Sequence, residues 1–217
     1  VTDLEALVLP VTPPGPGWTS TQAFEFNGVD SEMFSVRDSF ASRFSALKGW
    51  AISLWVKVET PASSGDYMPL VMNRGVNENA YSGVYIDLRK SGSDRYVLVQ
   101  PRAAGLSPNA FSGPIAYTSG QWQHILVHFN RTSSVIEIWV DGAISGTPAA
   151  FNPTSEINMG NAAPWAVGCY NAFNAPAVGN YFPFGSHSTG SPLPGYMSDI
   201  AFYGDELTVA EIGAIYN

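Results

Sequence analysis

Two histidines in the middle of the chain have a spacing that could serve a metal ion. His124 and His128 lie four residues apart in QWQHILVHFN, and on a helix this spacing would bring two imidazoles to one metal. The segment reads as a strand, in which four residues span about 13 Å. Joint metal binding is therefore excluded for a strand, and we interpret both histidines as structural.

Two carboxylates in the next segment are the nearest approach to a hydrolytic pair. Glu137 and Asp141 alternate onto one face of SVIEIWVDG, but four strand residues again separate them by about 13 Å. The two carboxylates of a glycoside hydrolase lie about 5 to 9.5 Å apart, so we interpret Glu137 as a solvated strand residue. The sequence also contains no G-x-S-x-G motif and no glycine-rich phosphate loop. We therefore predict that the protein is not an enzyme.

A loop-like stretch at residues 167–195 is rich in aromatic rings as well as in Asn, Gly, Ser and Pro. Such rings can stack on sugars or anchor a protein interface, because both uses need large, rigid apolar area. The alternative is that they fold inward and pin the loop to its own domain. The candidate contact residues for a ligand or partner are Trp165, Tyr170, Phe173, Tyr181, Phe182, Phe184 and His187.

The composition limits the kinds of element that can position these groups. Charged residues make up 13% of the 217 positions and aromatic residues another 13%, with 21 Gly and 16 Pro, which is typical of many short strands. The net charge is −8, and the ten Lys and Arg residues form no basic stripe, so nucleic acid is not a predicted partner. No run of 18 apolar residues occurs, so no membrane insertion is predicted. No signal peptide is visible before LEALVLPV.

Apolar residues alternate with a period of two from Phe24 onward, which predicts β-strands. In WAISLWVKVE the residues at positions 50, 52, 54, 56 and 58 share one face, which we expect to face the core. Other predicted strands lie in AFEFNGVDSEMFSV, MPLVMN, YSGVYIDLRK, RYVLVQPRA and QWQHILVHFN. HFNRTSSVIEIWVDG predicts a hairpin that ends in a tight turn at Asp141–Gly142.

The two ends of the chain differ from this pattern. PPGPG excludes a helix or a central strand near the start, so residues 1–22 are predicted to be an extended arm or linker, and residues 23–217 one domain. The arm either tethers the domain to something else or lies along its own domain. LTVAEIGAIYN predicts a short helix with a capping box from Thr208 to Glu211 and with Val209, Ile212 and Ile215 or Tyr216 on one side.

The order of these segments resembles the laminin-G-like branch of the concanavalin A-like lectin/glucanase superfamily. The matching pieces are FEFNGVDSEMFSV, WAISLWVKV, GQWQHILVHFN, SVIEIWVDG and PGYMSDIAFYGDELTVAEIGAIY. The resemblance implies an all-β fold, a two-sheet antiparallel jelly-roll sandwich. Gln123 stands where relatives usually have His, and the loop at residues 170–193 is longer than usual. The paired acids of catalytic relatives, E-x-D-x-x-E or E-x-D-x-E, are absent.

The resemblance also implies a structural Ca²⁺, for which the matching candidates are Asn27, Asp30 and Asp199. The alternative is that these side chains cap turns and bond at the surface. No other cofactor is expected.

The function implied is a non-catalytic recognition module that binds a glycan or protein through edge loops, at an extracellular, cell-surface or virion-surface location. A structural decoration or capsid-stabilising protein of a virus particle is the first alternative, with the arm and the aromatic loop contacting a second copy or a neighbouring capsid subunit. An accessory carbohydrate-binding module of a larger enzyme is the second.

Overall fold

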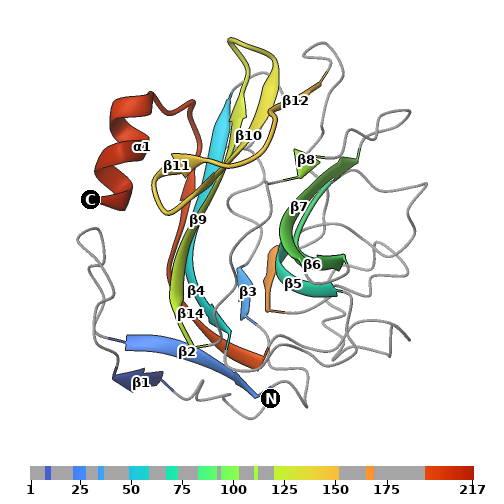
Figure 1. The fold of residues 1–217 in the computed structure, drawn as a ribbon. Coiled ribbons are helices and arrows are strands. Elements are labelled where there is room, and N and C mark those ends of the chain that lie inside the picture. The colour runs from blue at the N-terminus through green and yellow to red at the C-terminus, as the bar shows by residue number, and fades with distance from the viewer. Residues whose placement is uncertain are drawn as a thin grey trace.

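The alternating segments form two antiparallel sheets that pack face to face, with one helix on the outside, in the computed structural model of the chain (Figure 1). The structure describes residues 8–10, 22–27, 34–36, 49–58, 67–72, 83–91, 94–102, 110–111, 120–151, 165–168 and 194–217. None of the helices in these ranges is long and apolar enough to cross a bilayer. The architecture confirms the predicted jelly-roll sandwich.

The larger sheet contains eight strands within the described residues, in the order β1-β2-β14-β4-β9-β10-β11, with β12 also paired to β10. Their bounds are β1 Val8–Pro10, β2 Gln22–Asn27, β14 Pro194–Tyr203, β4 Trp50–Val58, β9 Trp122–Asn130, β10 Val135–Val140, β11 Ala143–Ile144 and β12 Ala149–Ala150. Strand β1 belongs to the predicted arm and pairs with β2, Val8 opposite Phe24. At these three residues the arm lies along its own domain.

The smaller sheet contains six strands within the described residues, in the order β3-β13-β5-β6-β7-β8. Their bounds are β3 Phe34–Val36, β13 Trp165–Val167, β5 Tyr67–Met72, β6 Gly83–Ser91, β7 Asp94–Arg102 and β8 Ala110–Phe111. Strands β2 and β3, which follow each other in AFEFNGVDSEMFSV, lie in different sheets.

The facing sides of the sheets enclose the main core. On β4 the predicted core face is confirmed, because Trp50, Ile52 and Leu54 are at most 1% exposed and join the central apolar cluster. Trp50 stacks on Phe129 of the neighbouring β9, with ring centroids 3.7 Å apart. The other face of β4 is also buried, and Ala51 has no exposed surface. A second layer therefore covers the outside of the larger sheet.

That layer is the C-terminal helix α1, Val209–Tyr216. The predicted capping box is confirmed: Thr208 Oγ1 accepts from the Glu211 N–H, and Glu211 Oε2 accepts from the Thr208 N–H. Ile212 packs with Ala51 and Leu126 in a second apolar cluster. The sequence predicts Val209 on the same side, but it is 70% exposed. Of the predicted side, Ile212 and Ile215 therefore join the cluster and Val209 does not.

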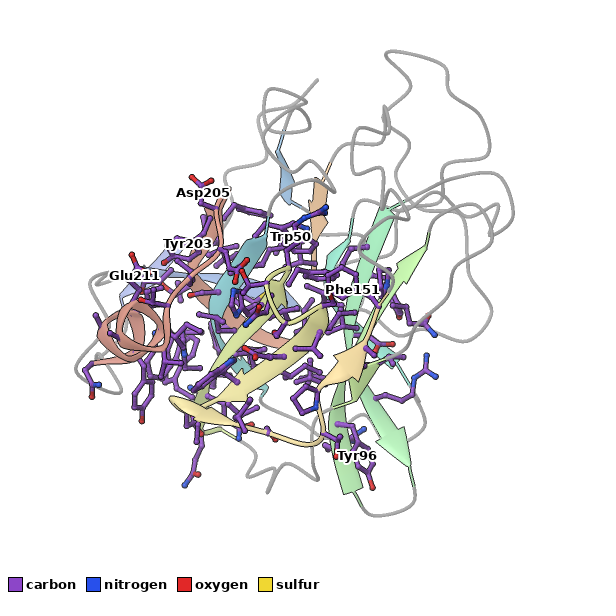
Figure 2. The ribbon with its side chains drawn as sticks, turned by 90° about the horizontal axis from the view of Figure 1, so that it is seen from above. Trp50, Tyr96, Phe151, Tyr203, Asp205 and Glu211 are labelled. Carbon is purple, nitrogen blue, oxygen red and sulfur yellow. The ribbon has the colours of Figure 1, made fainter. Side chains whose placement is uncertain are left out.

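The two sheets curve in the same direction (Figure 1). As a result, the outer face of the larger sheet is convex and carries α1, whereas the outer face of the smaller sheet is concave. Seen from above, the helix, the larger sheet and the smaller sheet form three successive layers, with Tyr203 and Glu211 on the helix side and Tyr96 on the smaller sheet (Figure 2). Any surface function must therefore use the convex face, the concave face or the loops between them.

Candidate functional site

His124 lies on the convex face in contact with a serine. Its Nε2 is 3.2 Å from Ser53 Oγ, while Nδ1 is buried and accepts no hydrogen bond from the described residues. The ring is fully buried, and this burial lowers the pKa of His124 from 6.5 to about 4. The imidazole is therefore neutral at pH 7. Trp55 and Tyr216 pack around it, with ring centroids 5.1 and 5.7 Å away.

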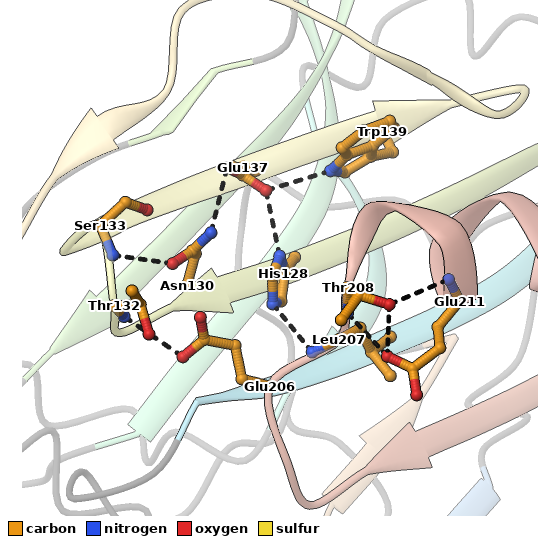
Figure 3. Close-up of polar contacts among 10 residues, drawn as sticks. All are labelled: His128, Asn130, Thr132, Ser133, Glu137, Trp139, Glu206, Leu207, Thr208 and Glu211. Carbon is orange, nitrogen blue, oxygen red and sulfur yellow. Dashed lines mark hydrogen bonds and ion pairs between the residues drawn. The ribbon is translucent and has the colours of Figure 1, made fainter.

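His128 lies further along β9 and joins the sheet to the segment that leads into α1 (Figure 3). Its Nδ1 is 3.0 Å from Glu137 Oε2, and its Nε2 accepts from the Leu207 N–H at 3.2 Å. Glu137 also accepts from Asn130 Nδ2 and Trp139 Nε1, both at 3.4 Å. These partners place the proton of neutral His128 on Nδ1.

The hydrogen bonds of Glu137 correct its interpretation as a solvated residue. The carboxylate is 15% exposed and serves three donors. The signal was present in the predicted hairpin, because pairing Asn130 with Val135 places Glu137 directly opposite His128. Cross-strand partners on one face interact in this way.

Neither the His128–Glu137 pair nor the His124–Ser53 pair has the geometry of a catalytic dyad. A general base needs a ring nitrogen that can reach the substrate, yet Nε2 of His128 is already bonded to Leu207 and the ring is 1% exposed. Ser53 and His124 are equally inaccessible, at 3% and 0% exposure. The part of the chain that the structure describes holds no group of three metal-ligating side chains. The convex face under α1 is therefore built for attachment of the helix.

The concave face of the smaller sheet carries a different set of side chains. On β6, Val84, Ile86 and Leu88 point into the core, so the residues between them point outward. The register pairs these outward residues with partners on β7: Tyr85 with Gln100, Asp87 with Leu98, and Arg89 with Tyr96. Two tyrosines, an arginine, an aspartate and a glutamine thus lie on neighbouring central strands.

Asp87 is the centre of this set. Its side chain is fully buried, and neither carboxylate oxygen accepts a hydrogen bond of ordinary geometry from the described residues. Arg89 Nη2 is 3.6 Å from Asp87 Oδ2, which makes an ion pair longer than a hydrogen bond. Burial raises the pKa of Asp87 from 3.8 to about 6, while the adjacent Tyr85 and Arg89 act in the opposite direction.

The residues around Asp87 that reach the surface are Arg89, whose side chain is 26% exposed, and the half-buried Tyr96 and Gln100. An arginine offers a planar set of donors that fits a carboxylate or two neighbouring hydroxyls. A tyrosine ring offers an apolar surface to a sugar, and a glutamine amide both donates and accepts. None of these residues was among the predicted contact residues, although Tyr-x-Asp-x-Arg in YIDLRK already placed three such side chains on one strand face.

The structure describes only one of the predicted contact residues. Trp165 lies in β13, while Tyr170, Phe173, Tyr181, Phe182, Phe184 and His187 lie outside the described residues. Their role as ligand or partner contacts stays a prediction.

Of the candidate calcium ligands, Asp30 lies outside the described residues, and Asn27 and Asp199 lie on the paired strands β2 and β14. The register puts Asn27 opposite Pro194, and the five residues from there to Asp199 span about 17 Å. Asp199 has a φ of 47° next to an irregularity in the pairing with β4, and its Oδ2 accepts from Ser198 Oγ at 3.2 Å. Calcium binding stays a prediction.

Comparison with known proteins defines the family. Residues 34–213 match the laminin-G-like sequence model of the concanavalin A-like lectin/glucanases superfamily. No curated protein matches the chain.

Solved structures share the architecture at low identity. The CBM40 domain of the Ruminococcus gnavus IT-sialidase, bound to α2,3-sialyllactose, has a TM-score of 0.64 at 12% identity and covers 90% of this chain and 96% of its own. The binding domain of Paraclostridial Mosquitocidal Protein 1 has a TM-score of 0.65 at 15% identity, over 97% of this chain and 45% of its own. A heptameric SAP-like pentraxin from Limulus polyphemus has a TM-score of 0.53 at 15% identity, over 78% of this chain and 70% of its own.

Proposed function

Because the chain belongs to the concanavalin A-like lectin/glucanases superfamily, we propose that it is a non-catalytic module that recognises a glycan through the concave face of its smaller sheet. The observation that carries the proposal is the cross-strand pair Arg89 and Tyr96, with Asp87 buried beside them. Rigid central strands hold this pair, which favours a preformed site.

The chemistry of the pair favours a sugar that bears a carboxylate. The Arg89 guanidinium binds the carboxylate through paired hydrogen bonds, while the Tyr96 ring packs on the apolar side of the sugar. Asp87 positions the guanidinium without contacting the ligand, because its own side chain is fully buried. The sialyllactose in the Ruminococcus gnavus CBM40 structure supports an acidic sugar as the first ligand to test.

The test compares wild type with Arg89→Ala and Tyr96→Ala. A glycan array with sialylated, uronic-acid and neutral oligosaccharides identifies a ligand, and isothermal titration measures its Kd. Each substitution should weaken binding at least about tenfold, because Arg and Tyr are enriched among the binding hot spots that contribute about 2 kcal/mol or more. Arg131→Ala is the matched control, since Arg131 lies in the turn between β9 and β10, on the other sheet.

Two results would contradict the proposal: an array on which no glycan binds, or variants that stay folded and bind as tightly as wild type. An extracellular, cell-surface or virion-surface location goes with this function and rests on it alone. The virion decoration role and the formation of a homo-oligomer stay predictions, which size-exclusion chromatography of the isolated chain would test.

A further inference from the structure

Three side chains on the convex face form a row beyond the end of α1. The register sets Tyr196 of β14, Lys57 of β4 and Trp122 of β9 side by side. All three are half-buried. This row, here named the Trp122 row, lies on the opposite side of the sandwich from Arg89 and Tyr96.

The rings of the Trp122 row lean toward each other across the lysine. Trp122 and Tyr196 belong to strands that are separated by β4, which corresponds to about 9.5 Å between backbones. Their ring centroids are nevertheless only 6.3 Å apart, tilted by 52°. Lys57 Nζ lies 4.9 Å from the centroid of the Tyr196 ring, within the range of a cation–π contact. The ammonium group is thereby held against the Tyr196 ring.

The last turn of α1 covers the part of the convex face next to the Trp122 row. Tyr216 packs on Trp55, with ring centroids 6.0 Å apart, and Trp55 is 4% exposed. One step further along the strands, at the Trp122 row, the side chains are half-buried. In Figure 1 the helix lies beside the upper half of the larger sheet, and the start of β9 lies in the lower half.

We propose that the Trp122 row is a second sugar-contact site, which takes a neutral pyranose ring; the inference rests on the proposed glycan-binding function. The apolar C–H side of a pyranose packs on the Trp122 ring, as flat apolar groups do on aromatic residues. The Lys57 ammonium donates to the hydroxyl or ring oxygens. A neutral sugar is favoured because the row contains no arginine that could pair with a carboxylate, and its one ammonium group already lies against the Tyr196 ring.

Two sites on opposite faces change how the module binds. The sheets of a sandwich are about 10 Å apart, so a short oligosaccharide cannot wrap from one face to the other. Each face then contacts a different glycan chain or a distant part of one chain. Simultaneous binding raises the apparent affinity for a dense surface above that for either soluble ligand.

The test is an NMR titration that reads the Trp122 indole N–H directly. The resonance is assigned with Trp122→Phe, and the probes are the tetrasaccharides of β1,4-linked glucose and of β1,4-linked mannose. The proposal predicts a concentration-dependent shift of this indole at millimolar sugar. Binding should be at least about tenfold weaker for Lys57→Met, read at the same indole, and for Trp122→Ala, read at the backbone amides of β4 and β14. Val209→Ala, which truncates a side chain that is 70% exposed on α1, is the control and should bind as wild type does.

The outcomes separate this site from the concave one. If resonances of the smaller sheet shift and the Trp122 indole does not, the second site is wrong and the proposed function stands. If the Trp122 indole shifts and Arg89→Ala changes no binding to any sugar, the second site stands and the concave site is wrong. No shift of the indole with either tetrasaccharide also contradicts the second site. Thermal unfolding of each variant shows whether lost binding reflects lost folding.

Discussion

The convex face under α1 and the concave face of the smaller sheet each carry a carboxylate on an inner strand, and the two carboxylates differ in their hydrogen bonds. Under the helix, both ring nitrogens of His128 and both oxygens of Glu137 have hydrogen-bond partners. On the concave face, the oxygens of Asp87 accept no ordinary hydrogen bond from the described residues. A buried polar group without a hydrogen bond calls for an explanation, and for Asp87 we propose that it positions Arg89.

The largest expected effect on stability comes from Gly142→Ala, which disturbs the packing of α1 on the convex face. A Cβ at this position would lie 2.5 Å from Tyr216 Cδ1, and the backbone has a φ of +77°. The left-handed backbone and the overlap together should cost about 3 kcal/mol in the free energy of unfolding. Gly213→Ala is the matched control, because a Cβ added there would meet nothing within 4 Å and helix propensity favours Ala by about 1 kcal/mol. Urea unfolding of both variants checks the contrast; equal stabilities would show that α1 is not held against this turn.

A second prediction concerns the pH dependence of stability, to which the two faces contribute with opposite sign. The pKa of His124 is about 4 in the folded state and 6.5 when unfolded, so the unfolded chain binds the extra proton between these values and acidification destabilises the fold. The pKa of Asp87 is about 6 in the folded state and 3.8 when unfolded, so here the folded chain binds the extra proton and acidification stabilises the fold. Each shift corresponds to about 3 kcal/mol.

The two contributions therefore nearly cancel between pH 6.5 and pH 4 in the wild type. Asp87→Asn removes the contribution that stabilises the fold on acidification. The free energy of unfolding of this variant should therefore fall on acidification relative to wild type. His124→Gln removes the contribution that destabilises the fold on acidification. The free energy of unfolding of this variant should therefore rise on acidification relative to wild type. Urea titrations at several pH values measure both slopes, and identical pH profiles for the two variants would contradict the assignment of these groups.

The smallest expected effect tests whether the faces are independent. Thr208→Ala breaks the capping box and should cost about 1 kcal/mol. The exposed Thr132 contributes only its backbone N–H, to Glu206 Oε2 at 3.2 Å, so Thr132→Ala should leave stability unchanged. Both variants should bind the concave-face glycan as wild type does. Weaker binding by Thr208→Ala alone would show that the helix and the concave face are coupled.

Local patterns account for the parts of the structure that were predicted well. The alternation around Ile52 identified the core face of β4, and Thr208 with Glu211 identified the start of α1. The turn at Asp141 and Gly142 was visible because both adopt a positive φ, 49° and 77°, which these residue types tolerate. Burial of the second face of β4 was not predicted, because it depends on a helix far away in the sequence, at the C-terminal end.

The sequence by itself determined that the chain forms a β-sandwich with a capped terminal helix, since strand period, turn residues and capping are encoded within a few neighbouring residues. Only the tertiary structure decided which buried polar residues have hydrogen-bond partners and which do not. Glu137 and Asp87 both alternate with apolar residues on central strands, but Glu137 meets His128 across the hairpin while Asp87 is buried beside Arg89 at 3.6 Å. The partners of a buried charge come from strand register and layer packing, and these are long-range contacts.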